Sequence, residues 1–364
     1  MPSAIQAAVC YEFGRPLVVD EILLDPPQQG EVKVRIAATA ICHSDVHLIR
    51  GEWGGRPPVV AGHESAGIVE EVGRNVTLTR PGDRVVVSLL RSCGRCFYCT
   101  TGAPHQCEGR FALDRETRLH TRRGQPIGQG NRTGSFAEYV VVDQSQVVAV
   151  PDEMPLDRAA LLACGVITGF GAVVNTARVR PSSSVVVIGV GGVGLNSVQG
   201  AALSGAQPII AVDLLDNKLA AAMAFGATHT LNAMHQHDLE YAVRELTSGR
   251  GADYCFVTVG SVEAVAQGFR LIGVGGMEVI VGIPAAGAEV SFPVHAIVGE
   301  RTVTGSAMGS TRLSVDVPRL VALYLQKRLK LDELITARYP LGQINEAIEA
   351  MEAGKALRNV IVFP

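Results

Sequence analysis

Short apolar runs separated by Gly and Pro characterise the first 150 residues of the chain. Runs of this kind, bounded by turn sequences such as Arg80-Pro81-Gly82-Asp83, predict β-strands. The predicted strands are Val32–Ile36, Gly67–Val72, Arg84–Ser88 and Phe136–Val142. Their irregular spacing predicts a partly open barrel with long loops. The polar, arginine-rich segment from Gly109 to Gly134 is expected to be a solvated loop.

Strand-like and helix-like segments alternate after about Pro151. The predicted strands are Val185–Gly189, Ile209–Asp213, Tyr254–Val257 and Glu278–Gly282, and the predicted helices are Leu195–Leu203, Lys218–Phe225, Leu239–Leu246 and Val262–Leu271. Because these strands are apolar throughout, they indicate a parallel sheet that is covered on both faces. After about Val303 two amphipathic helices, Val317–Leu329 and Ile344–Met351, and a strand, Asn359–Phe363, complete the pattern.

Composition narrows the class of protein. A chain of 364 residues suits about two domains, and 47% hydrophobic against 18% charged residues allows large cores. The net charge of −3 gives no sign of nucleic acid or an anionic membrane as a partner. The N-terminus lacks a signal-peptide pattern, and the apolar stretch Val185–Leu195 is broken by glycines and too short to span a bilayer. We therefore expect a cytoplasmic protein.

A glycine-rich turn follows the first strand of the predicted parallel sheet. Its sequence is Gly189-Val190-Gly191-Gly192-Val193-Gly194, and a helix is predicted directly after it. Such glycines allow a tight turn, close approach of a pyrophosphate and close packing of helix on strand. Asp213 lies 19 residues beyond Gly194, at the end of the next predicted strand. A carboxylate there accepts hydrogen bonds from ribose hydroxyls and would repel the extra phosphate of NADP, which predicts NAD as the cofactor.

Four of the eight cysteines form a cluster, Cys93-x2-Cys96-x2-Cys99-x7-Cys107. Four thiolates within one short segment predict a closed, tetrahedral zinc site with a structural role. An iron–sulfur cluster is the competing interpretation, although this is not a common cluster spacing. Disulfides are less favoured because a cytosolic chain is expected to keep its thiols reduced.

A second metal site is suggested by residues that are scattered along the chain. Each of Cys42, His63, Glu64 and Cys164 has an ordinary structural explanation when taken singly. Polar and reactive groups nevertheless gather in the segment Cys42–His47, just after a predicted strand. Hydride chemistry at a nucleotide site also needs an electrophile beside it. The scattered residues are therefore candidates for a catalytic metal site.

These motifs occur in the order seen in zinc-containing alcohol dehydrogenases of the medium-chain dehydrogenase/reductase superfamily, which the chain resembles over nearly its whole length. The resemblance rests on Cys42-x-Ser44-Asp45-x-His47, Gly62-His63-Glu64, the cysteine cluster, Cys164 and the glycine-rich turn with Asp213. It implies an α/β protein. A GroES-like, β-rich catalytic domain would span residues 1–165, and a Rossmann domain with a doubly wound parallel sheet would span 166–307. Residues 308–364 would return to the catalytic domain.

The resemblance also implies a role for individual residues. Cys42, His63 and Cys164 would bind a catalytic zinc, with Glu64 behind the metal and Asp45 orienting His63. Ser44 would take the proton of the alcohol, and His47 would pass it to solvent through the nicotinamide ribose. The remaining implied contacts are with the cofactor, namely His43 and Arg358 at its phosphates, Thr168 and Val193 at the nicotinamide, and Lys218 at the adenosine ribose, with Val281 as a further cofactor-binding residue.

The implied reaction is reversible hydride transfer between an alcohol and NAD, at a site that closes to exclude water. By position, Trp53, Leu89, Ile283 and Ala307 would line the substrate pocket, which favours apolar primary or secondary alcohols. Trp53 could equally be a packing residue of the barrel. Two alternatives remain open: a thiol-dependent formaldehyde dehydrogenase, and a zinc- and NAD-binding sensor without turnover. An apolar sheet edge around Glu278–Ile283 and Thr302–Gly305 predicts a homodimer or homotetramer.

Overall fold

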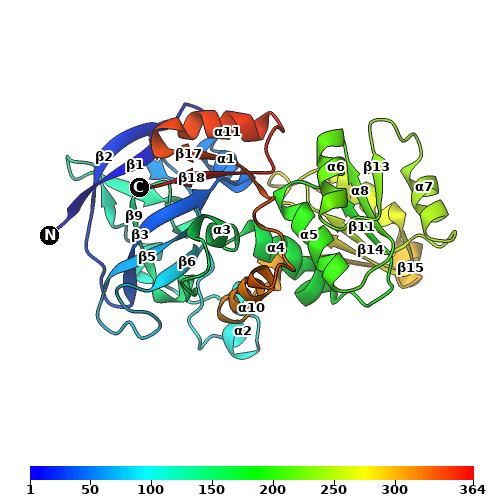
Figure 1. Ribbon diagram of the computed structural model, residues 1–364, viewed down its shortest axis with the longest axis horizontal. Helices are drawn as coiled ribbons and strands as arrows, with labels where there is room; N and C mark the ends of the chain where they lie inside the picture. Colours follow the sequence, from blue (N-terminus) through cyan, green and yellow to red (C-terminus); the bar gives the residue numbers. More distant parts are fainter. The chain divides into compact units, whose positions relative to one another are not determined.

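A computed structural model of the chain describes all 364 residues, which divide into two compact units. The first unit combines residues 1–164 with residues 312–364, and the second comprises residues 165–311. The boundaries predicted from the sequence, 165/166 and 307/308, lie close to these divisions. Figure 1 labels the elements of both units.

The first unit contains a small closed β-barrel. Its strands are β1 (Ser3–Cys10), β2 (Val18–Leu24), β4 (Val59–Val60), β7 (Leu119–His120) and β8 (Pro126–Gln129). They follow the order β1-β2-β7-β8-β4, and β1 closes the barrel by pairing with β4. Strands β7 and β8 lie in the segment that was expected to be a solvated loop. The expected partly open barrel is wrong: the barrel is closed, this segment supplies two of its five strands, and the strands predicted for it lie in the second sheet of this unit.

Buried ion pairs explain why the segment differs from a solvated loop. Arg118 is almost fully buried and donates to both carboxylate oxygens of Glu31, at 2.9 and 2.6 Å, and to Glu116 at 2.9 Å. Arg91 is also buried and donates to Asp114 at 2.8 Å. Paired and hydrogen-bonded charges of this kind can occupy a protein interior. The charge pattern alone does not distinguish such anchors from exposed charges.

A seven-stranded sheet packs with the barrel in the same unit. Its order is β10-β6-β5-β3-β18-β17, with β9 added to β3. The strands are β3 (Glu31–Ala40), β5 (Glu64–Val72), β6 (Arg84–Ser88), β9 (Tyr139–Asp143), β10 (Val147–Ala149), β17 (Ile335–Pro340) and β18 (Arg358–Val362). Val360 of β18 lies opposite Ala40 of β3, and the Ile41 N–H donates to the Asn359 carbonyl at 3.0 Å. The C-terminal strand thus reaches the segment that carries Cys42.

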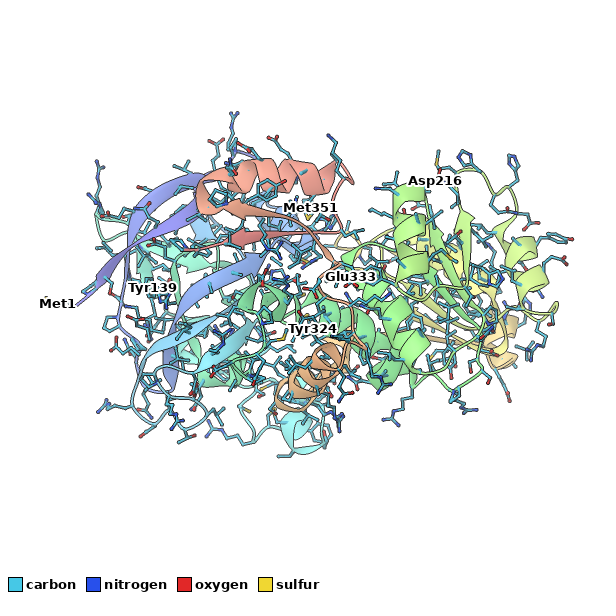
Figure 2. The ribbon with its side chains drawn as sticks, in the orientation of Figure 1. Met1, Tyr139, Asp216, Tyr324, Glu333 and Met351 are labelled. Carbon is cyan, nitrogen blue, oxygen red and sulfur yellow. The ribbon has the colours of Figure 1, made fainter.

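Five helices accompany these strands: α1 (His43–Ile49), α2 (Phe97–Thr100), α3 (Leu156–Leu161), α10 (Leu313–Leu325) and α11 (Ile344–Glu352). Helix α11 packs on the barrel through one apolar face. Its buried residues Ile344, Ala347, Ile348 and Met351 have helical spacing and join the core of the barrel. Met351 is labelled on this helix in Figure 2.

The second unit is a parallel sheet of six strands, in the order β13-β12-β11-β14-β15-β16. The strands are β11 (Val185–Ile188), β12 (Ile209–Asp213), β13 (His229–Asn232), β14 (Ala252–Val257), β15 (Ile272–Ile280) and β16 (Thr302–Gly305). Helices α5 (Gly192–Leu203) and α6 (Asp216–Ala224) lie on one face, and α7 (Leu239–Leu246) and α8 (Val262–Leu271) on the other (Figure 1). Two shorter helices, α4 (Gly165–Gly171) and α9 (Val294–Val298), complete the unit. The predicted doubly wound, Rossmann-type sheet is confirmed.

None of the helices combines the length and the apolar character that crossing a membrane requires.

Candidate active site and metal centres

The first unit brings Cys42, His63, Glu64 and Cys164 into one buried cluster. Cys42 precedes helix α1, His63 directly precedes strand β5, which begins at Glu64, and Cys164 follows helix α3. Pairing of β3 with β5 sets Ala40 opposite Glu64, which carries Cys42 toward His63. The ligand atoms of all four residues lie within 4.8 Å of one another. Residues separated by more than 100 positions in the sequence thus form one compact donor set.

Asp45 organises the cluster through three hydrogen bonds. Its Oδ1 accepts from Nδ1 of His63 at 2.8 Å and from the Gly62 N–H at 3.0 Å, while its Oδ2 accepts from the Cys42 N–H at 3.1 Å. The bond to Nδ1 leaves Nε2 of His63 facing the cluster as the remaining ring nitrogen. That atom is buried and has no hydrogen-bond partner. A neutral imidazole with Nδ1–H on a carboxylate and a free Nε2 fits a metal ligand.

The electrostatics of the two thiols differ. The hydrogen bond with Cys164, assisted by His63, holds the pKa of Cys42 well below its ordinary value despite burial. The same hydrogen bond, together with burial, raises the pKa of Cys164. Two cysteine sulfurs, an imidazole nitrogen and a carboxylate form a donor set that suits zinc. The residues present therefore fit a zinc ion.

Arg358 pairs with Glu64 beside this cluster. Its Nη2 donates to Oε2 of Glu64, and the arginine is only 6% exposed. Oε1 of Glu64 is buried without a partner, and burial raises the pKa of Glu64 to about 7 although Arg358 opposes the shift. The sequence did not predict this ion pair. The phosphate contact expected of Arg358 stays a prediction.

The four clustered cysteines form a second compact donor set. The Sγ atoms of Cys93, Cys96, Cys99 and Cys107 all lie within 4.8 Å of one another, and those of Cys96 and Cys107 are 3.8 Å apart. Zn–S bonds of about 2.3 Å in a tetrahedron require sulfurs about 3.8 Å apart, so the cluster fits zinc. The backbone N–H groups of Cys93 and Gly109 donate to Sγ of Cys107 at 3.2 Å. Such bonds stabilise thiolates.

The glycine-rich turn of the second unit joins β11 to α5. Gly189 has φ of +84°, and a Cβ on Gly194 would lie 1.9 Å from the Gly189 carbonyl oxygen, so glycine is required at both positions. A Cβ on Gly191 would meet nothing within 4 Å, which leaves its backbone open to a ligand. Asp213, at the end of β12, accepts from the Val190 N–H at 2.8 Å and from the Leu214 N–H at 2.8 Å. The carboxylate thus also holds the turn in place.

Comparisons with known proteins identify the family. Residues 28–152 match the alcohol dehydrogenase GroES-like domain, and residues 192–326 match the zinc-binding dehydrogenase domain. The chain is 40% identical over 370 residues to an NDMA-dependent alcohol dehydrogenase of Amycolatopsis methanolica, covering 98% of each chain. The chain belongs to the zinc-containing alcohol dehydrogenase family. It is a zinc alcohol dehydrogenase enzyme, which removes the sensor without turnover from the alternatives.

Two solved structures of this family closely resemble the chain. An alcohol dehydrogenase zinc-binding domain protein from Burkholderia ambifaria has a TM-score of 0.95 at 36% identity. The benzyl alcohol dehydrogenase from Acinetobacter calcoaceticus has a TM-score of 0.92 at 33% identity. Each comparison covers 100% of both chains. The likeness therefore includes both units of this alcohol dehydrogenase.

The other predicted site residues are distributed over both units. His43, Ser44 and His47 lie on α1, and Trp53 stacks on His47 with ring centroids 5.3 Å apart. The first unit also holds Leu89, and the second holds Thr168, Val193, Lys218, Val281, Ile283 and Ala307. The roles expected of these residues stay predictions. The sequence did not predict two residues that contact this set. Asn131 has its Nδ2 3.3 Å from Nδ1 of His63, and Glu52 pairs with His47.

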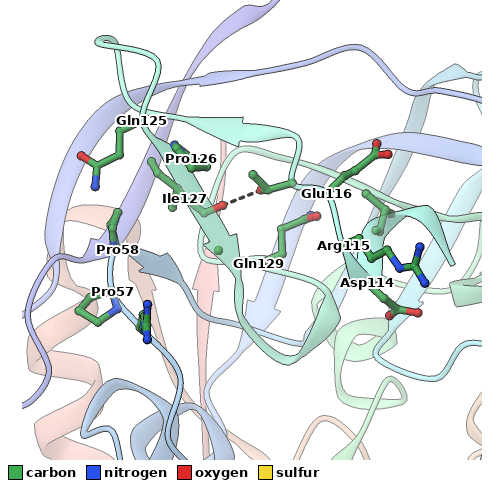
Figure 3. Close-up of a pocket in the computed structure, with 13 residues that line it drawn as sticks. Pro57, Pro58, Asp114, Arg115, Glu116, Gln125, Pro126, Ile127 and Gln129 are labelled. Carbon is green, nitrogen blue, oxygen red and sulfur yellow. Dashed lines mark hydrogen bonds between the residues drawn. The ribbon is translucent and has the colours of Figure 1, made fainter. Parts of the chain in front are cut away.

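Figure 3 shows a pocket of about 530 Å³ in the first unit, beside strand β8. Pro57, Asp114, Glu116 and Ile127 are among the residues that line it. The dashed line marks the bond from Oγ1 of Thr117 to the Ile127 carbonyl, at 2.5 Å. Both carboxylates already pair with buried arginines, and the lining includes none of the zinc-fitting residues. We assign this pocket no function.

Proposed function

We propose that this alcohol dehydrogenase transfers hydride reversibly between an apolar primary or secondary alcohol and NAD, to give an aldehyde or ketone. The observation that carries the proposal is the buried cluster of Cys42, His63 and Cys164, in which Nε2 of His63 has no partner within the chain. A buried polar atom without a partner is costly unless a ligand satisfies it. Oxidation of an alcohol needs an electrophile at the alcohol oxygen, and a metal ion held by these residues would supply it.

Cys42, His63 and Cys164 would hold the catalytic zinc, with Glu64 as a further donor, and Cys93, Cys96, Cys99 and Cys107 would hold the structural zinc. The catalytic ion supplies Lewis acidity, which lowers the pKa of the alcohol. Asp45 keeps His63 in the ligating tautomer through the bond to Nδ1.

Proton removal is assigned to helix α1. Ser44 and His47 are three residues apart on this helix, so their side chains project from the same face. Ser44 would accept the alcohol proton and His47 would deliver it to solvent. His47 is suited to the second step because 37% of its side chain is exposed. General base catalysis of this kind contributes about a hundredfold to ten-thousandfold in rate.

The choice of NAD follows from Asp213. Its carboxylate lies at the end of β12 beside the glycine-rich turn, where a phosphate on the ribose would meet a negative charge. The preference for an apolar alcohol rests on Trp53, Leu89, Ile283 and Ala307 and on the benzyl alcohol named for one relative. Assembly as a homodimer or homotetramer is proposed because β16 is the open edge of the second unit's sheet.

A panel of alcohols tests the proposal. Zinc-replete protein is mixed with ethanol, benzyl alcohol, cyclohexanol or glycerol, and with NAD, NADP or NDMA as acceptor. NDMA is included because it is named for one relative. The proposal expects acceptor reduction with NAD and the apolar alcohols, and little with NADP or glycerol. Activity that requires an added thiol together with formaldehyde, and no activity with free alcohols, would contradict it.

A further inference from the structure

Glu52 lies against His47 because of a tight turn at the end of helix α1. The Gly51 N–H donates to the Leu48 carbonyl and the Glu52 N–H to the His47 carbonyl, each at 3.0 Å. Gly51 has φ of +76°, and a Cβ there would lie 2.6 Å from the ring of Phe13. The turn therefore requires glycine and is held by packing. It brings the Glu52 carboxylate back over the helix that carries His47.

The carboxylate of Glu52 is bound mainly to His47. Its Oε2 pairs with Nδ1 of His47, while its Oε1 lies 4.0 Å from Nη1 of Arg50. Arg50 has a nearer partner in Glu352 of α11. The ring of Trp53 stacks on His47 at an interplanar angle of 27°. The imidazole is thus held at one edge by a carboxylate and on one face by an indole.

A carboxylate at Nδ1 determines what the other ring nitrogen does. An ionised carboxylate only accepts hydrogen bonds, so Nδ1 carries the hydrogen and Nε2 of the neutral ring has a free lone pair. The same logic holds for Asp45 and His63 in the metal cluster. In that pair the free nitrogen fits a metal ion, whereas His47 is partly exposed and its free nitrogen can exchange protons with water.

We propose that Glu52 is a positioning residue for proton removal: it holds His47 in the Nδ1–H tautomer with Nε2 as the proton acceptor. The inference rests on the proposed function. In the proton path, the alcohol O–H proton passes to the Ser44 oxygen as the Ser44 hydroxyl gives up its own proton, Nε2 of His47 takes up one proton from this path, and His47 then releases one proton to water. Glu52 neither gains nor loses a proton, and no electrons move in this step.

The first test compares Glu52→Leu, Glu52→Gln and the wild type by steady-state kinetics with a primary alcohol and saturating NAD. Loss of an orienting partner typically costs about tenfold to hundredfold in activity. Glu52→Leu should therefore lower kcat by that amount, with the KM for the alcohol within about twofold of wild type. Glu52→Gln should remain within about threefold, because its amide oxygen still accepts from Nδ1–H. Glu71→Leu, an exposed change on β5, is the matched control and should leave kcat unchanged.

Two further readouts separate positioning from a structural role. In Glu52→Leu, kcat should rise with the concentration of N-ethylmorpholine buffer at constant pH and ionic strength, because a dissolved base replaces the misplaced imidazole. The wild-type kcat should not depend on the buffer. Histidine-selective ¹⁵N NMR, with His47 assigned through His47→Gln, should show the Nδ1–H tautomer in wild type and Glu52→Gln and a mixture of tautomers in Glu52→Leu.

Wild-type kcat in Glu52→Leu, or equal losses in Glu52→Gln and Glu52→Leu, would overturn the inference. An unchanged His47 tautomer in Glu52→Leu would overturn it as well, and this result does not depend on activity. Failure of the wild type to oxidise any alcohol would instead contradict the proposed function. Circular dichroism and zinc content confirm that each variant is folded before it is compared.

Discussion

Replacing Glu278 with methionine is expected to stabilise the second unit by an amount that grows with pH. Glu278 lies on β15 with none of its surface exposed, and neither carboxylate oxygen has a hydrogen-bond partner. A Cβ on Gly268 would lie 2.5 Å from Oε1 of Glu278 and 3.2 Å from Sγ of Cys255, so the acid is enclosed between helix α8 and strand β14. Methionine has nearly the same length and needs no partner.

The size of the effect follows from the pKa of the buried acid. Burial raises the pKa of Glu278 from its ordinary value of 4.5 to about 8. Between these values the folded state holds a proton that the unfolded state has lost, so folding becomes less favourable as pH rises. The free energy gained by Glu278→Met should increase by about 1.4 kcal/mol per pH unit in this window and reach on the order of 3 kcal/mol at pH 7. Above about pH 8 the gain should level off.

Hydrogen exchange measured by mass spectrometry reports this effect where it arises. Protection of peptides from β14 and β15 is compared between Glu278→Met and wild type at pH 6, 7 and 8, so that the intrinsic pH dependence of exchange cancels. Glu289→Gln, an exposed change in the same unit, is the control. Its effect on protection should be small and should not depend on pH. A difference in protection that stays constant from pH 6 to 8, or a loss of protection in Glu278→Met, would refute the reasoning.

Three further predictions concern the site and the assembly. Asp213→Gly should reduce a preference for NAD over NADP of about a hundredfold, measured as the ratio of kcat/KM values, and an unchanged ratio would remove Asp213 as its cause. Ser44→Ala should lower kcat by about a hundredfold or more while the dissociation constant for NADH, followed by fluorescence, stays within about twofold; normal turnover would show that the proton does not pass through this hydroxyl. Light scattering should give at least a dimer, and Val303→Asp on the edge strand β16 should weaken it; a wild-type monomer at micromolar concentration would contradict the edge-pairing argument.

The parallel sheet could be predicted closely because its strands leave a clear pattern. Ile209–Asp213 is a continuous apolar run ending in one acid, and the structure has β12 at these residues. Strand β13 was missed because its sequence, His229–Asn232, is polar and half exposed at the edge of the sheet. Strands β7 and β8 were missed for a different reason, since the charges around them are paired inside the unit rather than solvated.

The residues of the candidate site also differ in how well the sequence predicts their contacts. Cys93 to Cys107 lie close in sequence, so their spacing alone suggests a common ligand. Cys42 and His63 come together only through the pairing of β3 with β5, and Cys164 joins them because the chain returns to this place after helix α3. The resemblance to a family was therefore needed to group these residues. Glu52 and Arg358 leave no motif for their contacts, because a tight turn and a C-terminal strand decide which groups they meet.

Zinc content measured together with alcohol oxidation on the same samples tests the central claim most directly. Wild-type protein should contain two zinc ions per chain and reduce NAD with an apolar alcohol. His63→Ala should retain one zinc ion and lose nearly all alcohol oxidation, because the structural set of four cysteines is intact while the buried cluster has lost its imidazole. One zinc ion or iron in the wild type would contradict the account, as would a His63→Ala chain that keeps two zinc ions and the wild-type rate.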